Sequence, residues 1–227
     1  MPIRPAVVLL LASLLGLPCL AKDAKVGQTS ITLTAPPGQC ELDPGQPSDA
    51  STLQAVRAAI GGNTLLAMYA DCKQLADWRV GKRGLLEDFA QYQVSSDATD
   101  MPPPPDPAQM LKQLCANLRE EGERMMTGLA PDVKQRVEQA LKNTQVNQLR
   151  FLGVVADEDS ACYGAIAQRL KAQTGKDVTI VGLSATMFVK GKLLYYYLYA
   201  PYRSAQTVTA LLAKQKLNVA ALLAANP

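Results

Sequence analysis

Histidine, the side chain most often used as a general base, is absent from this chain of 227 residues. Its absence excludes Ser-His-Asp and Cys-His nucleophilic sites and removes the commonest metal ligand. The sequence has neither a GxxxxGK[ST] phosphate loop nor a GxGxxG turn after a strand, and the basic turn at residues 81–84 is typical of a solvated loop. We therefore expect a protein that is not an enzyme, with no metal and no cofactor.

Carboxylates are the remaining groups that could act together on a substrate. Glu87 and Asp88 are neighbours in an expected strand, so they point to opposite faces of the sheet. Glu120-Glu121 is a second adjacent pair, within an expected helix. The trio at residues 157–159 could offer oxygen ligands to a calcium ion, but it lacks the spaced ligands of a dedicated loop. We interpret the trio as a solvated turn.

A tyrosine-rich stretch near the C-terminus is the best candidate for a binding surface. Residues 178–202, VTIVGLSATMFVKGKLLYYYLYAPY, predict two strands joined by a tight turn at Lys190-Gly191. With a two-residue loop, Val189 faces Lys192, and the alternation of side chains fixes every other pair. One face of this hairpin is then a core face, and it carries Val181, Leu183, Ala185, Met187, Leu194, Tyr196, Leu198 and Ala200.

The opposite face of the hairpin is more polar. The candidate ligand or partner residues on it are Ser184, Thr186, Tyr195, Tyr197 and Tyr199. Amphipathic aromatic surfaces suit sugars, lipids and peptides. The competing interpretation, which we place first, is that helices bury this face and that each tyrosine hydroxyl is hydrogen-bonded at the edge of the layer.

Alternating strands and helices must position this hairpin. The sequence before it predicts a strand at 30–34, a helix from Ser48 or Asp49 to about Ile60, a strand at 64–70, a short helix through Trp78 and a partly exposed strand at 85–94. After it, Ser204 caps a final helix that runs to about Ala224.

Residues 95–107 interrupt this pattern and divide the chain into two halves. Four consecutive prolines at 102–105 favour a stiff, extended crossover, although a proline ligand for a binding module is an alternative. Asp106 and Pro107 then begin a helix that we expect to end at Gly128, and Pro131 begins another.

A run of strands follows these helices. Residues 148–156 predict one strand, whereas Ala161–Lys171 is ambiguous. Tyr163, Ile166 and Leu170 share a helical face, but the position of the segment within an antiparallel series favours a strand. We predict a strand.

The N-terminus has the pattern of an export signal. Arg4 precedes an apolar run at 6–17, and small residues at positions 19 and 21 fit cleavage after Ala21. The run is shorter than the roughly 20 residues that span a bilayer. We expect a signal peptide at 1–21 and a periplasmic or secreted mature protein without a membrane span. An uncleaved anchor is the alternative, and acylation of Cys19 is disfavoured by Pro18.

Four cysteines remain in the mature chain, at positions 40, 72, 115 and 162. An even number in an exported protein indicates two disulfides, for which three pairings exist. We favour Cys40–Cys72 and Cys115–Cys162, because pairing of neighbours closes each half of the chain on itself. Loops of this size stabilise by about 4 kcal/mol each in the chain-entropy model.

The charge balance argues against nucleic acid as a partner. The formal net charge is +3, and removal of the signal peptide deletes one positive charge and no acid. A nucleic-acid binder normally has a clustered basic excess.

Two motifs carry a resemblance to known proteins. The opening GQCELDP at 38–44 and the ending GKLLYYYLYAPY at 191–202, with this order of elements, resemble a set of exported bacterial proteins of unknown function and the Mog1/PsbP-like α/β/α sandwich. The resemblance implies an α+β fold in which helices cover an antiparallel sheet in three layers, here one domain at 22–227. That fold mostly serves as a binding or accessory module, so it implies a role without locating a site.

Three classes of function follow from these expectations. The first is a non-catalytic envelope module that binds an unknown envelope protein. The second is a small-ligand binder with a concave cavity bounded by Tyr195, Tyr197 and a loop. The third and least supported is a hydrolase of unrecognised type, which requires clustered carboxylates in one cleft.

Overall fold

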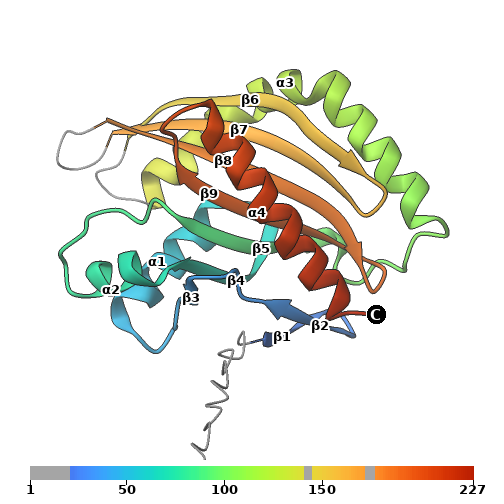
Figure 1. Cartoon of the computed structure of the whole chain (residues 1–227), viewed down its shortest axis with the longest axis horizontal. Coiled ribbons are helices and arrows are strands. Elements are labelled where there is room, and N and C mark those ends of the chain that lie inside the picture. Colours follow the sequence, from blue (N-terminus) through green and yellow to red (C-terminus); the bar gives the residue numbers. More distant parts are fainter. Residues whose placement is uncertain (1–20, 141–144, 172–176) are drawn as a thin grey trace, which may run out of the picture.

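A seven-stranded antiparallel sheet forms the centre of the molecule (Figure 1). The structure is a computed structural model that describes residues 21–140, 145–171 and 177–227. The strand order is β3-β4-β5-β9-β8-β7-β6, so β9 of the predicted hairpin β8–β9 is the middle strand of the sheet. The strands are β3 (Gln39–Glu41), β4 (Asn63–Asp71), β5 (Phe89–Ser95), β6 (Gln145–Glu158), β7 (Ala161–Lys171), β8 (Asp177–Val189) and β9 (Lys192–Pro201).

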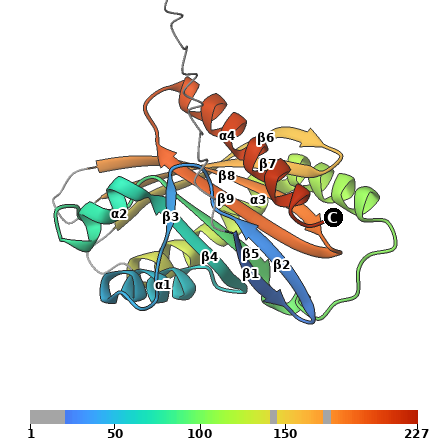
Figure 2. The same ribbon diagram turned by 60° about the horizontal axis from the view of Figure 1, so that its bottom comes forward.

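Helices cover both faces of this sheet, as Figure 2 shows for α4 on one side and α1 on the other. One cover consists of α4 (Ala205–Ala224) with the small hairpin β1 (Ala21–Val26) and β2 (Thr29–Thr34). The other consists of α1 (Pro47–Ala59) and α3 (Pro107–Ala140), and α2 (Cys72–Arg79) follows β4. This arrangement confirms the α+β, three-layer fold predicted from the sequence.

The predicted register of the β8–β9 hairpin is confirmed. Val189 pairs with Lys192 and Ser184 pairs with Tyr197. Lys190 and Gly191 both have positive φ, 47° and 77°, as a two-residue turn of the I′ type requires. The predicted core face is buried under α4, apart from the half-buried Ala200.

Polar side chains fix α4 on the core face. Gln215 is fully buried and donates to the carbonyl oxygens of Leu183 and Tyr196, both at 3.0 Å. Asn218 donates to the Tyr196 hydroxyl at 2.8 Å. Hydrogen bonds require defined positions of donor and acceptor, so these bonds fix the position of α4 along the hairpin.

Both predicted disulfides are present. Cys40–Cys72 joins β3 to the start of α2, and Cys115–Cys162 joins α3 to the start of β7. The first closes the half of the chain before the proline-rich crossover, and the second closes the half after it. Ala161–Lys171 is also a strand, β7, as predicted.

The expectation of a partly exposed strand at 85–94 is wrong. The strand β5 begins only at Phe89 and lies between β4 and β9, so residues 90–94 are buried. Its polar residues Gln91 and Gln93 are only 5% and 3% exposed. Hydrogen bonds between side chains, described below, make their burial tolerable.

The expectation of two helices between residues 107 and 140 is also wrong. A single helix, α3, of 34 residues passes through Pro131. Proline removes one helical hydrogen bond and bends a helix rather than always ending it. Beyond the proline, Val137 packs against the buried cluster of Val146, Leu170 and Ile180, and this contact favours continuation of the helix.

The strand β1 was not predicted; in it Ala24 and Val26 are buried and Lys25 between them is exposed. Residues 1–20 of the signal peptide predicted at 1–21 lie outside the described residues, and its last residue, Ala21, is the first residue of β1. The proline-rich crossover has no regular structure at 102–105. The Nζ atom of Lys192 anchors the segment before it, through the carbonyl oxygens of Thr99 and Met101 at 2.8 Å each.

Candidate functional site

The tyrosine face of the hairpin lies under α1 and α3, and part of it lines a pocket. This partly open pocket has a volume of about 310 Å³, at the lower end of the range of small-molecule sites. Most of its lining is apolar. The apolar residues come from α1 (Ala55, Val56, Ala59), α3 (Met126, Val133, Val137) and the sheet (Met68, Phe89, Leu149, Ile166, Leu170, Ile180).

Tyr197 and Tyr199 contribute to the floor of this pocket. Their rings are stacked with centroids 6.3 Å apart, and Phe89 stacks on Tyr199 at 4.4 Å. Gly182, the partner of Tyr199 on β8, makes this arrangement possible, because a Cβ atom there would lie 2.6 Å from the Tyr199 ring. The aromatic floor therefore depends on one glycine.

The hydroxyl groups of Tyr197 and Tyr199 have no hydrogen-bond partner among the residues that the structure describes. Burial raises the pKa of both groups, and the neighbouring Tyr199 and Tyr195 raise the pKa of Tyr197 further. Both hydroxyls are therefore neutral at physiological pH and free to donate to or accept from a bound molecule.

A line of amides leads into the pocket beside these tyrosines. Asn63 donates to Gln93 at 2.9 Å, and Gln93 donates to Gln91 at 2.7 Å. Gln91 pairs with Tyr197 across the β5–β9 ladder and lines the pocket. The Nε2 group of Gln91 has no partner within the described part of the chain, although the residue is 5% exposed. It is a donor available to a ligand.

Trp78 also lines the pocket. Its indole Nε1 is buried and has no hydrogen-bond partner in the described ranges. An apolar pocket with a few converging polar groups is the usual form of a small-molecule site. The groups found here are the Gln91 amide and the tyrosine hydroxyls.

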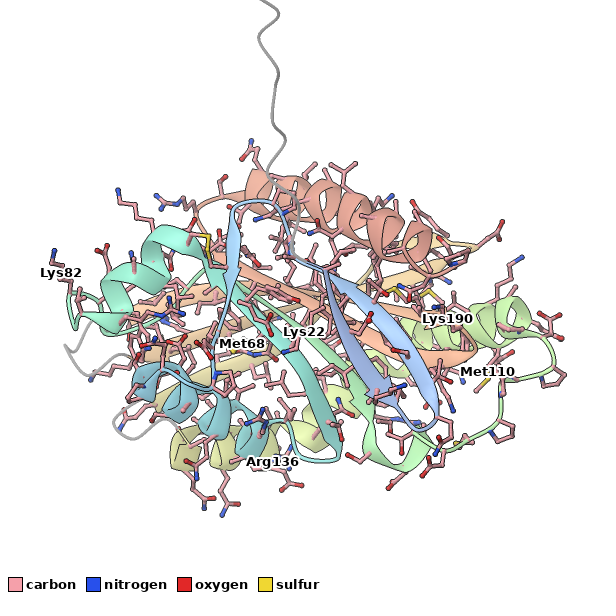
Figure 3. All side chains as sticks on the ribbon, turned by 90° about the horizontal axis from the view of Figure 1, so that it is seen from below. Lys22, Met68, Lys82, Met110, Arg136 and Lys190 are labelled. Atoms are coloured by element: carbon pink, nitrogen blue, oxygen red, sulfur yellow. A yellow bond between two sulfur atoms is a disulfide. The ribbon has the colours of Figure 1, made fainter. Side chains whose placement is uncertain are left out.

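Arg136 on α3 is the one charged residue among the described residues that line the pocket. Its Nε donates to the carbonyl oxygen of Ala59, the last residue of α1, at 3.1 Å. No carboxylate within the described ranges forms an ion pair with it. Figure 3 labels Arg136 where α3 passes α1.

The structure divides the predicted tyrosine face into two parts. Tyr197 and Tyr199 line the pocket, whereas Tyr195, Ser184 and Thr186 do not. Tyr195 continues the aromatic row, with its ring centroid 6.4 Å from that of Tyr197. Ser184 forms a long bond of 3.4 Å to the carbonyl oxygen of Gly164. The expected cavity between Tyr195, Tyr197 and a loop is thus displaced towards Tyr199 and bounded by two helices.

Sequence reasoning missed most of the polar lining. Gln91 and Gln93 alternate with Ala90, Tyr92 and Val94 in one strand, and this spacing could have indicated that the two glutamines share a face. Arg136 and Trp78 carry no such signal, because their approach to the pocket depends on how α2 and α3 pack.

No carboxylate of the described residues lines the pocket. Asp88 accepts from Gln39 at 2.8 Å, Glu158 pairs with Lys216 at 2.7 Å, and Asp157 pairs with Arg119 at 3.0 Å. Within residues 21–140, 145–171 and 177–227, no group of three His, Cys, Asp or Glu side chains could hold a metal ion. No helix in the same ranges is long and apolar enough to cross a bilayer.

Comparisons with known proteins add little beyond the fold. No protein-family model matches the chain, and no curated protein matches it. The solution structure of cyanobacterial PsbP from Synechocystis sp. PCC 6803 is similar at 13% identity with a TM-score of 0.35, over 85% of this chain and 87% of that one. The crystal structure of the Ran-binding protein Mog1p from Saccharomyces cerevisiae is similar at 13% identity with a TM-score of 0.30, over 92% and 93%. Both are weak structural resemblances.

Proposed function

We propose that this protein is a non-catalytic binding protein that holds a small, largely apolar ligand between the sheet and helices α1 and α3. The observation that carries the proposal is the apolar pocket of about 310 Å³ into which Gln91 and Tyr197 present unpartnered polar groups. A ligand that pairs with these groups forms hydrogen bonds within a mostly apolar pocket, where such bonds are stronger than in water. This proposal favours the ligand-binding alternative over a module that binds only an envelope protein.

We place this function outside the cytosol, in the periplasm or in the secreted fraction. The two disulfides support this location, because such bonds persist in oxidising compartments. The charged residue and apolar run at the N-terminus support it independently.

Binding of 1-decanol tests the proposed function, because its size and single hydroxyl match the pocket. A ligand that binds only the folded state raises the melting temperature with its concentration. We expect this rise, with calorimetric binding, for the unmodified protein. In Ala55→Phe, a large side chain enters the pocket from α1, and both effects should be lost.

Ala58→Phe is the matched control, because Ala58 is exposed on the same helix and does not line the pocket. This variant should bind decanol as the unmodified protein does. The proposal fails if the unmodified protein does not bind decanol, or if Ala55→Phe binds it equally well while remaining folded.

A further inference from the structure

We infer that the natural ligand of this pocket is an organic anion, an apolar body with a carboxylate at one end, and that Arg136 binds the carboxylate. The inference rests on the proposed function and names the class of ligand. It follows from the charge, the donor groups and the size of the pocket.

The charge of the lining favours an anion. Among the described lining residues, Arg136 supplies the single positive charge and no residue supplies a negative one. A cation would lie near an arginine without a carboxylate to compensate, whereas an anion would gain an attraction strengthened by the apolar surroundings. A neutral ligand would leave the half-buried guanidinium without an acidic partner.

The geometry of Arg136 leaves its strongest donors available. The bond to the Ala59 carbonyl uses Nε, so the two terminal nitrogens remain for a ligand. Gly61 borders the guanidinium closely, since a Cβ atom there would lie 3.1 Å from Cζ. This contact and the bond to Ala59 hold the planar group in place. A fixed guanidinium is well suited to bind a carboxylate through two hydrogen bonds.

The size of the pocket limits the ligand body. A water molecule occupies about 30 Å³ in the liquid, so a pocket of about 310 Å³ accommodates roughly ten non-hydrogen atoms. The floor of Tyr197, Tyr199 and Phe89 favours an aliphatic or aromatic body. Decanoate has this size and chemistry and serves as the probe.

A series with one chain and three head groups tests the inference by titration calorimetry: decanoate, 1-decanol and decyltrimethylammonium. A charge-assisted hydrogen bond contributes enough for decanoate to bind about tenfold more tightly than decanol. The cation should bind most weakly. In Arg136→Met, decanoate affinity should fall to that of decanol, while decanol affinity changes by about twofold or less. Arg136→Lys should keep part of the preference for decanoate.

Arg136 also caps the C-terminus of α1, so its replacement could destabilise the protein. A cooperative urea-unfolding transition is therefore first recorded for each variant, to show that it is folded. If Arg136 had only a structural role, Arg136→Met would lower the free energy of unfolding without changing the ratio of decanoate to decanol affinity. This result would overturn the inference. Equal binding of decanoate and decanol by the unmodified protein would also overturn it and leave the proposed function intact. No binding of either compound would overturn both.

Discussion

Adjacent tyrosines on β9 have opposite environments, although their sequence neighbours are almost the same. Tyr196 points into the core, where Asn218 donates to its hydroxyl, and Tyr197 points into the pocket with an unpartnered hydroxyl. Replacement by phenylalanine removes one hydroxyl in each case and preserves the ring. The pair therefore separates the contribution of tyrosine to stability from its contribution to binding.

Tyr197→Phe should change the free energy of unfolding by less than about 0.5 kcal/mol, because no hydrogen bond is lost. It should weaken binding of decanol and of decanoate. Tyr196→Phe should lower the free energy of unfolding by about 1 kcal/mol, because it leaves the Asn218 amide without its acceptor, and should not affect binding. Urea unfolding and calorimetry measure the two quantities. A larger stability loss for Tyr197→Phe than for Tyr196→Phe would contradict this assignment.

Asp49 is the one fully buried carboxylate among the described residues, and it links α1 to α2. Burial raises its pKa, but hydrogen bonds from Arg79 and from the Asp43 backbone N–H outweigh this effect and leave the pKa below the usual value. A carboxylate with a depressed pKa in the folded state stabilises the protein above its unfolded pKa of about 3.9. This contribution is lost as the pH falls through the folded pKa.

Asp49→Asn should therefore lower the free energy of unfolding by about 2 kcal/mol near neutral pH, because Arg79 loses its charged partner. The difference from the unmodified protein should shrink as the pH falls below about 4. Urea unfolding across this range measures it. Asp97→Asn is the control, since Asp97 is exposed and has no ion pair among the described residues. A difference that stays constant with pH would contradict the role of the charge.

At the scale of elements, the close contact between β8 and β9 at Gly182 shapes the pocket floor. Gly182→Ala should push the Tyr199 ring away from β8 and towards the pocket, because the new methyl group would lie 2.6 Å from the ring. We expect a loss of about 1–3 kcal/mol in the free energy of unfolding and weaker decanol binding. The control is Gly128→Ala in α3, where nothing lies within 4 Å of the added methyl group. It should be neutral or slightly stabilising. Unchanged binding by Gly182→Ala would contradict this description.

The elements differ in how far the sequence predicts them. The β8–β9 hairpin follows from strict alternation and from one turn, both of which are local. The single helix α3 does not follow from local sequence. Pro131 is a local signal for a break, and the contacts that stabilise the helix beyond it come from residues distant in sequence. The buried strand β5 was expected to be partly exposed, because the hydrogen bonds that satisfy Gln93 come partly from Asn63 on β4, which is distant in sequence.

The pocket was the feature least predictable from the sequence. Tyr197 was identified as a candidate from its face on the hairpin, but the walls come from α1, α3 and several strands. A cavity is the space that packed elements leave unfilled, so its position depends on tertiary contacts that no local pattern encodes. Arg136 is an example: it lies beyond Pro131 on α3, in a segment that was predicted to be a separate helix, and it lines the pocket only through the packing of α3.

At the scale of the whole molecule, export remains a prediction with a direct test. Cleavage after Ala21 would give a mature chain that begins at Lys22, and Lys22 forms an ion pair with Glu41 next to the sheet edge. N-terminal sequencing of the protein from the envelope or secreted fraction should return Lys22 as the first residue. Recovery of Met1, or of a chain that begins with an acylated Cys19, would contradict the prediction.

The two disulfides should each contribute to the stability of the whole molecule. They close loops with sequence separations of 32 and 47 residues, for which the chain-entropy model gives about 4 kcal/mol each. The two double variants, Cys40→Ala with Cys72→Ala and Cys115→Ala with Cys162→Ala, should each lower the free energy of unfolding by up to that amount. Urea unfolding without reductant measures it.

Thiol titration of the denatured, unreduced protein provides the independent check, because the mature protein should show no free thiol. Peptide mapping without reductant should link Cys40 to Cys72 and Cys115 to Cys162. A peptide that joins Cys40 to Cys162 would contradict the pairing and, with it, the closure of each half of the chain on itself. Free thiols in protein recovered from outside the cytosol would contradict the disulfides themselves and remove their support for export.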